Sequence, residues 1–212
     1  MERPAGRGAC RTGSSSSWTT RTSTEARVAD STATGNPQPC GHVNPVALAQ
    51  HITRDSPYDR QLTQVRIYRG QPDATKQPGS YGASRRQHAM WQRDPLVHLV
   101  TRPLRYPQGW PADPAQEKGI DVQLAVDFVA LASQDAYDIG IMMSADTDLK
   151  PALEFVAALN NNRKPRAEVA AWSSAGQHSP RLSIPGTSLY CHWVGDAVYR
   201  QVKDTTDYAK AP

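Results

Sequence analysis

Apolar and polar positions follow two periodicities along the chain, and this pattern predicts alternating strands and helices. Residues 62–68 alternate as in a half-buried strand, residues 96–100 form a second strand, and residues 139–143 are a continuous apolar run. Such a run is typical of a strand buried on both faces of a parallel sheet. Helices are expected over 45–52, about 120–133 and about 149–160, with a helix permitted over 81–93 and a further strand near 168–172. This order predicts a three-layer α/β domain with a mainly parallel central sheet.

Residues 1–40 differ in composition from the rest of the chain. They contain no Leu, Ile, Phe or Tyr, and 13 of the 40 are Ser or Thr. Such a segment buries too little apolar surface to offset the entropy lost on ordering. We therefore predict a disordered tail over 1–40 and a folded domain over 41–212, whose last part is a C-terminal extension with a short strand over 180–185.

The composition also bears on the compartment and on metal chemistry. No apolar run approaches the roughly 18 residues that span a bilayer, and the N-terminus lacks the apolar stretch of a signal peptide. The expectation is a cytoplasmic protein without a membrane partner. Cys10, Cys40 and Cys191 are widely spaced and form no C-x-x-C pair, so they are interpreted as ordinary thiols.

Charge is distributed unevenly around a net value of +4. Five arginines oppose a single acid between Tyr81 and Trp110, whereas seven acids oppose one lysine between Gly119 and Asn160. The first segment would attract a polyanion and the second a multivalent cation. The alternative is that both segments are solvated surfaces.

The predicted helix near 120–133 is apolar around nearly its whole circumference, which predicts that it is largely buried. Asp121 lies in its first turn, where it is either a ligand or a charge stabilised by the free N–H groups. Asp127 lies six residues further on, about 240° around the helix axis, so the two acids do not share a face. Asp127 is expected to pair with Gln123 at i, i+4 and to support the site rather than to bind a metal.

Two further acids, Asp146 and Asp148, follow the buried strand directly. Ligands of open parallel sheets bind beyond the carboxyl ends of the strands, so this is the expected position of a site. Oxygen ligands of this kind suit Mg²⁺ or Mn²⁺. The alternative is structural: Asp148 caps the following helix and Asp146 stabilises the turn.

These two segments resemble a known family. The run EKGIDVQLAVD at 117–127, followed by an aliphatic strand and SADTDL at 144–149, resembles the NYN domain family, the PIN-like group that includes LabA-like bacterial proteins. The resemblance covers roughly residues 41–172. It implies a PIN-like fold and a ribonuclease dependent on Mg²⁺ or Mn²⁺, with Asp121, Asp146 and Asp148 as catalytic and metal-binding residues and Asp127 as a further acid of the motif.

One element of the family pattern has no counterpart in this chain: a first strand ending in Asp and followed closely by Asn. We hypothesise that residues from about 13 to before 41 come from a shifted reading frame. Read one base earlier, TCN codons for Ser14–Ser17 become four NTC triplets, each encoding Phe, Leu, Ile or Val. The last base of the Trp18 codon and the first two of the Thr19 codon then spell Asp, and the bases through Thr24 permit Tyr-Glu-Asn-Val-Tyr. The first strand is thus predicted to be missing or mistranslated.

Partners and rival functions follow from the same features. Arg85, Arg86, Arg102 and Lys118 are candidates for the RNA backbone, while Trp91 and Trp110 would stack on bases but are expected in the core. Without its first carboxylate the chain is either an enzyme inactive in this form or a non-catalytic RNA-binding or regulatory module. A haloacid-dehalogenase-like phosphatase is disfavoured, because its nucleophilic Asp lies on an early strand.

Overall fold

The computed structural model describes residues 14–20, 43–159, 166–174, 177–178 and 181–210. Its sheet has the strand order β3-β2-β1-β4-β5-β6, and β7 pairs with β5. All pairings are parallel except that of β6 with β5. The strands are β1 (Ser14–Thr20), β2 (Arg60–Gln71), β3 (Val97–Pro103), β4 (Ile139–Met143), β5 (Arg166–Ser174), β6 (Gln177–His178) and β7 (Cys191–Gly195).

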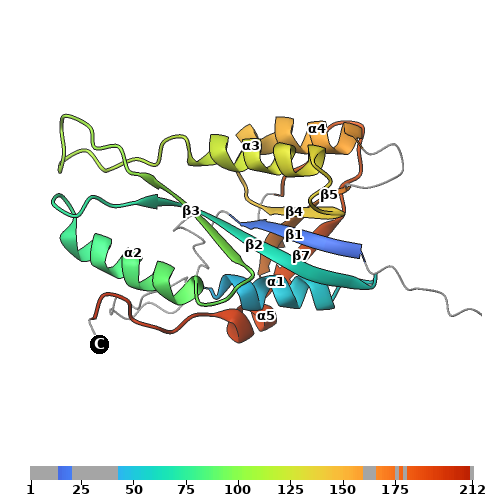
Figure 1. Ribbon diagram of the computed structural model, residues 1–212, viewed down its shortest axis with the longest axis horizontal. Coiled ribbons are helices and arrows are strands. Elements are labelled where there is room, and N and C mark those ends of the chain that lie inside the picture. The colour runs from blue at the N-terminus through green and yellow to red at the C-terminus, as the bar shows by residue number, and fades with distance from the viewer. Residues whose placement is uncertain (1–13, 21–42, 160–165, 175–176, 179–180, 211–212) are drawn as a thin grey trace, which may run out of the picture.

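Helices cover both faces of this sheet, which confirms the three-layer α/β architecture (Figure 1). One layer holds α3 (Ile120–Ser133) and α4 (Lys150–Leu159), with the short 3₁₀ helix η1 (Thr147–Leu149) before α4. The opposite layer holds α1 (Pro45–Arg54), α2 (Pro78–Trp91) and α5 (Asp196–Val202). Asn44 caps α1, because its Oδ1 accepts from the backbone N–H groups of Val46 and Ala47 at 3.0 Å.

Each face of the sheet contributes to its own apolar core. Met142 packs with Leu124 and Phe128 beneath α3 and α4. Ile141 and Met143 point the other way, into the core formed with α1 and α5. The continuous apolar run of β4 is therefore buried on both faces, as its sequence predicts.

The prediction of a disordered tail over residues 1–40 is wrong for Ser14–Thr20, which form the central strand β1. This strand pairs with β2 and β4, and the Cα of Trp18 is in register with those of Val65 and Ile141. The segment is held by backbone pairing along both of its edges. The prediction failed because it used composition alone, which does not reveal pairing with strands that are distant in the sequence. The first strand is therefore present in position, although it carries no Asp. The rest of the predicted tail lies outside the described residues.

Two other expectations are corrected. Helix α3 is not buried all round, because Val122 and Val126 are 65% and 55% exposed. Residues 181–185 contribute only an isolated bridge between Ile184 and Thr187, and the final strand is β7, followed by α5. Within the described part of the chain, no helix is both long and apolar enough to cross a membrane.

Candidate functional site

The parallel strands at the centre of the sheet end at a common edge, and the turn that carries Asp146 and Asp148 follows β4 there. Thr20 at the end of β1 is in register with Ile67 of β2 and Met143 of β4. The chain leaves β4 at this edge and runs through residues 144–146 into η1. Strands β2 and β3 run on to Gln71 and Pro103, and the chain later enters α3 through Gly119, whose positive φ of 74° favours glycine. The edge is thus built from the carboxyl ends of strands and from two helix starts.

Asp146 and Asp148 are held in a tight turn after β4. Oδ1 of Asp146 accepts from the backbone N–H of Asp148 at 3.0 Å, and the Ser144 hydroxyl accepts from the N–H of Asp146 at 3.1 Å. The structural role considered for Asp146 is therefore present, since it caps η1. Asp148 is exposed, and its carboxylate is available to a ligand at the edge.

Asp121 lies in the first turn of α3, close to the same turn in the fold. The residue is half-buried, and its Oδ1 atom is fully buried. Helix α3 contacts η1, and the buried Leu149 of η1 packs in one core with Ile120 and Leu124. The structure therefore brings the elements that carry Asp121 and Asp148 together.

The donor set suits a hard cation in its chemistry but is incomplete in its geometry. Asp121, Asp146 and Asp148 offer only carboxylate oxygens, as Mg²⁺ and Mn²⁺ prefer. Among the described residues, however, no group of three His, Cys, Asp or Glu side chains is arranged to hold a metal ion. The carboxylates do not by themselves fit a bound metal in this chain.

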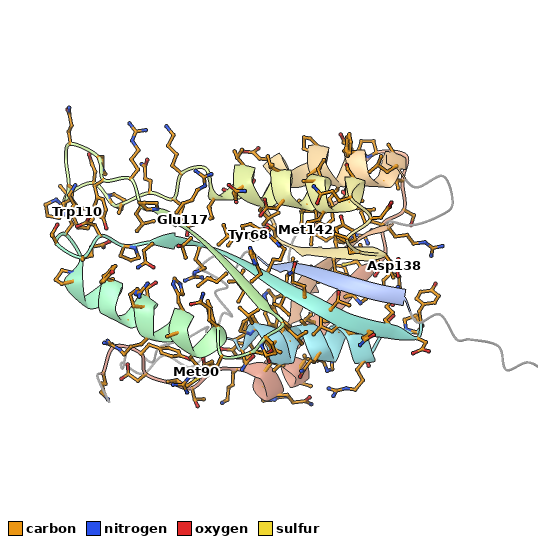
Figure 2. All side chains as sticks on the ribbon, viewed as in Figure 1. Tyr68, Met90, Trp110, Glu117, Asp138 and Met142 are labelled. Atoms are coloured by element: carbon orange, nitrogen blue, oxygen red, sulfur yellow. The ribbon has the colours of Figure 1, made fainter. Side chains whose placement is uncertain are left out.

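Asp127 lies in a different set of contacts, between α3 and β2. Its Oδ2 accepts from Nη2 of Arg66 at 2.9 Å and from the hydroxyl of Tyr68 at 2.8 Å. Nε2 of Gln123 donates to Oδ1 at 2.8 Å, which confirms the predicted i, i+4 pair. Figure 2 shows Tyr68 on β2, beneath α3.

These contacts set the protonation states of the network. Burial alone raises the pKa of Asp127, but the hydrogen bonds from Gln123, Tyr68 and Arg66 outweigh it, and the pKa is lowered overall. Burial raises the pKa of the Tyr68 hydroxyl, which therefore stays protonated and donates. Asp127 is thus a carboxylate held ionised by side chains of the protein itself.

The four basic residues proposed for RNA contact have different environments. Arg85 and Lys118 are exposed. Nη2 of Arg102 donates to Oε1 of Gln123 at 2.7 Å, which links it to the Asp127 network. Nε of Arg86 donates to the backbone oxygen of Tyr208 at 2.8 Å, so this guanidinium holds the C-terminal segment.

Sequence reasoning missed Arg66 and Tyr68 as members of this region. They alternate with Val65 and Ile67 in β2, and polar residues at such positions are ordinarily expected to face solvent. The available signal was a charged residue and a tyrosine at alternate positions of β2, on the face opposite the apolar Val65 and Ile67. Their partner Asp127 is about 60 residues away in the sequence, so the signal did not identify it.

Comparison with known proteins gives one match. Residues 30–177 match the family model described as the NYN domain. No curated protein and no solved structure matches the chain. The match covers β2 through β5, including all four acids discussed above.

Proposed function

Because the chain belongs to the NYN domain family, a group of PIN-like nucleases, we propose that it acts on RNA at the acidic edge of its sheet. Asp121, Asp146 and Asp148 are the proposed catalytic and metal-binding carboxylates. Asp127 is proposed to position α3 and not to contact the substrate. The proposed reaction is hydrolysis of an RNA phosphodiester. These carboxylates, completed by one further acid, would hold Mg²⁺ or Mn²⁺, which would supply an activated water and neutralise phosphate charge.

The observation that carries this proposal is the family match combined with the contact between α3 and η1. The match assigns the class of protein. The contact supports a shared site, because it joins the elements that carry the half-buried Asp121 and the exposed Asp148 near the edge where open parallel sheets bind ligands. Neither observation alone would favour a nuclease over another α/β protein with acids on its surface.

A further carboxylate at the end of β1 would complete the donor set. Thr19 and Thr20 are in register with Met142 and Met143, and β4 leads from there to Asp146. An Asp at position 19, as in the shifted reading of the gene, would stand at the carboxyl edge between β2 and β4. We therefore propose that the shifted reading of residues 14–24 is the hydrolytic form of the protein.

A second candidate function is supported by the incomplete metal group. With no three-ligand cluster among the described residues, the chain in its present form would bind RNA without cleaving it. This is the non-catalytic RNA-binding or regulatory module, and it uses the same surfaces.

The test compares two proteins on a labelled single-stranded RNA with Mn²⁺. One is the chain in its present form, and the other carries the shifted reading over residues 14–24, including Thr19→Asp. We expect cleavage only by the second, abolished by EDTA and by Asp121→Asn. The control is Arg54→Gln, at an exposed residue of α1. Absence of cleavage by both proteins, with RNA binding retained, would favour the binding module.

A further inference from the structure

A projecting arm beside the acidic edge carries aromatic and basic side chains that the catalytic assignment does not use. The arm consists of residues 72–77, after β2, and residues 104–119, between β3 and α3 (Figure 1). We propose that this arm binds single-stranded RNA and guides it to the carboxylates. The proposal rests on the proposed function, because it deepens the RNA recognition of the same site.

The two segments of the arm are fastened to each other by hydrogen bonds. The Tyr106 hydroxyl donates to Oε1 of Gln77 at 2.8 Å and accepts from the backbone N–H of Asp73 at 2.8 Å. Within the second segment, Arg105 and Gln116 pair through their backbones at 2.8 and 2.9 Å, which closes it into a loop. An arm ordered before binding loses less entropy when it takes up a ligand.

The base of the arm is fixed next to the start of α3. The backbone N–H of Gly70 donates to Oε1 of Glu117 at 2.7 Å. A Cβ at position 70 would lie 2.7 Å from Cγ of Glu117, so this close approach requires glycine. Lys118 follows directly and precedes Asp121 by three residues. A strand of RNA lying along the arm would therefore reach the candidate catalytic carboxylates.

Two aromatic rings form the centre of the arm. Tyr106 and Trp110 meet edge to face, with ring centroids 4.9 Å apart, and the ammonium of Lys76 lies 4.5 Å from the centroid of the Tyr106 ring. Both aromatic residues are half-exposed, and neither belongs to the two apolar cores of the described chain. The expectation that Trp110 packs in the core is thus wrong, whereas Trp91 does so. Figure 2 shows Trp110 at the outer end of the arm and Glu117 nearer α3.

Two acids of the arm are engaged in hydrogen bonds to its backbone, while two of its bases are exposed and unpaired within the described residues. Oδ1 of Asp73 accepts from the N–H groups of Thr75 and Lys76 at 2.8 and 3.0 Å, and Glu117 holds Gly70. The side chains of Arg105 and Lys118 are exposed and form no ion pair with any residue that the structure describes. The exposed side chains of Arg105 and Lys118 are therefore available to phosphate groups of a bound strand.

Aromatic rings select the kind of nucleic acid. Base stacking on Tyr or Trp requires an unpaired base, because bases within a duplex are already stacked on their neighbours. Unpaired cations beside such rings contact phosphates without reading sequence. The arm therefore fits single-stranded RNA with little sequence preference, and duplex RNA fits it poorly.

The test measures binding alone, by fluorescence anisotropy of a labelled 12-nucleotide single-stranded RNA in EDTA. Trp110→Ala is expected to weaken binding about tenfold, the loss of one stacked base. The double variant Arg105→Gln/Lys118→Gln is expected to weaken it several-fold and to flatten its salt dependence. Arg54→Gln removes an exposed arginine from the opposite layer and is the matched control, and circular dichroism checks that each variant is folded.

Each outcome decides between the two claims. The proposed role of the arm would be refuted if Trp110→Ala and the double charge variant bound the RNA within twofold of the parent's affinity. It would also be refuted if these variants lost as much affinity for a 12-base-pair duplex. If the arm variants lose binding while neither form of β1 cleaves RNA with Mn²⁺, the arm is supported and the hydrolytic function fails. If the restored form cleaves RNA but the arm variants bind it as tightly as the parent does, the hydrolytic function is supported and the arm is refuted.

Discussion

The hydroxyl of Tyr68 donates a 2.8 Å hydrogen bond to Oδ2 of Asp127, joining the central sheet to α3. Arg66 donates to the same oxygen at 2.9 Å, and Gln123 occupies Oδ1. Both carboxylate oxygens are thus bound by side chains of the protein. We infer that Asp127 fixes α3 against β2 and so fixes the first turn, which carries Asp121.

Asp127→Asn should therefore act on stability. The substitution leaves the Arg66 guanidinium, whose side chain is only 11% exposed, without its counter-charge. We expect a loss of about 2 kcal/mol in the free energy of unfolding, measured by urea denaturation. Asp148→Asn is the matched control, because Asp148 is exposed, and it should change stability by less than about 0.5 kcal/mol. Equal stabilities of the two variants would contradict the inference.

A second polar group is buried beneath the centre of the sheet. Arg60 of β2 binds Glu168 of β5 through two hydrogen bonds of 2.7 Å, and Nε2 of His192 lies 2.7 Å from the same carboxylate. Strands β1 and β4 lie between β2 and β5, so the ion pair spans two strands. Burial alone raises the pKa of Glu168, but the hydrogen bonds from His192 and Arg60 and their charges outweigh it, and the pKa is lowered overall.

Glu168→Gln should be strongly destabilising, because it leaves the charge of Arg60 buried, with a side chain 1% exposed. We expect a loss of about 3 kcal/mol or more, again by urea denaturation. The double variant Arg60→Met/Glu168→Leu removes both charges and should be more stable than Glu168→Gln alone. If the double variant were less stable than Glu168→Gln, the cost of leaving Arg60 without its counter-charge would not explain the effect, and the ion pair itself would stabilise the fold.

His88 predicts a dependence of stability on pH. It lies buried in α2, 3.3 Å from the hydroxyl of Ser84, and burial together with Arg69 and Arg85 lowers its pKa to about 4. Between pH 6.5 and 4 the unfolded chain binds a proton at this histidine that the folded protein does not, so stability falls as the pH falls. Protonation of His88 in the unfolded chain should thus lower the free energy of unfolding progressively from pH 6.5 to pH 4. Below pH 4 this effect of His88 should no longer change with pH.

His88→Gln should remove this part of the acid destabilisation. We expect the difference in unfolding free energy between parent and variant to change by about 3 kcal/mol from pH 7.5 to pH 4. Other titrating groups act on both proteins alike and cancel in the difference. A constant difference over this range would mean that His88 titrates normally in the folded protein.

The sequence predicted the helices and strands that have a clear local pattern of apolar residues. It did not predict which side chains of different helices and strands contact one another. The bounds of α3 and β4 match the predicted 120–133 and 139–143, because a helical apolar pattern and an apolar run are both local signals. The exposure of Val122 and Val126 depends on what lies outside α3, and the partners of Asp127 and Glu168 come from distant strands. The acids of the site were predicted by their positions after a strand and in a first turn, whereas the arm has no periodic pattern at all.

The central strand carries the last prediction. Strand β1 lies between β2 and β4, with helical layers on both faces of the sheet, yet its sequence is SSSSWTT. Central parallel strands are ordinarily apolar, because both of their faces are covered. The shifted reading would replace the four serines with Phe, Leu, Ile or Val. Since each fully buried aliphatic side chain contributes about 1.5–3 kcal/mol, the restored chain should be more stable by at least about 3 kcal/mol.

Two variants separate the packing of β1 from its chemistry. A chain with the apolar residues restored at 14–17 and Thr19 retained should gain the stability but not the cleavage of RNA, whereas adding Thr19→Asp should bring cleavage. Thermal unfolding and the Mn²⁺-dependent RNA assay are the two measurements. The nucleotide sequence supplies an independent check, because Ser14–Ser17 must use TCN codons for the shifted strand to exist. AGC or AGT codons at these positions, or restored chains that are no more stable, would refute the hypothesis, and the serine strand would then be the native centre of this sheet.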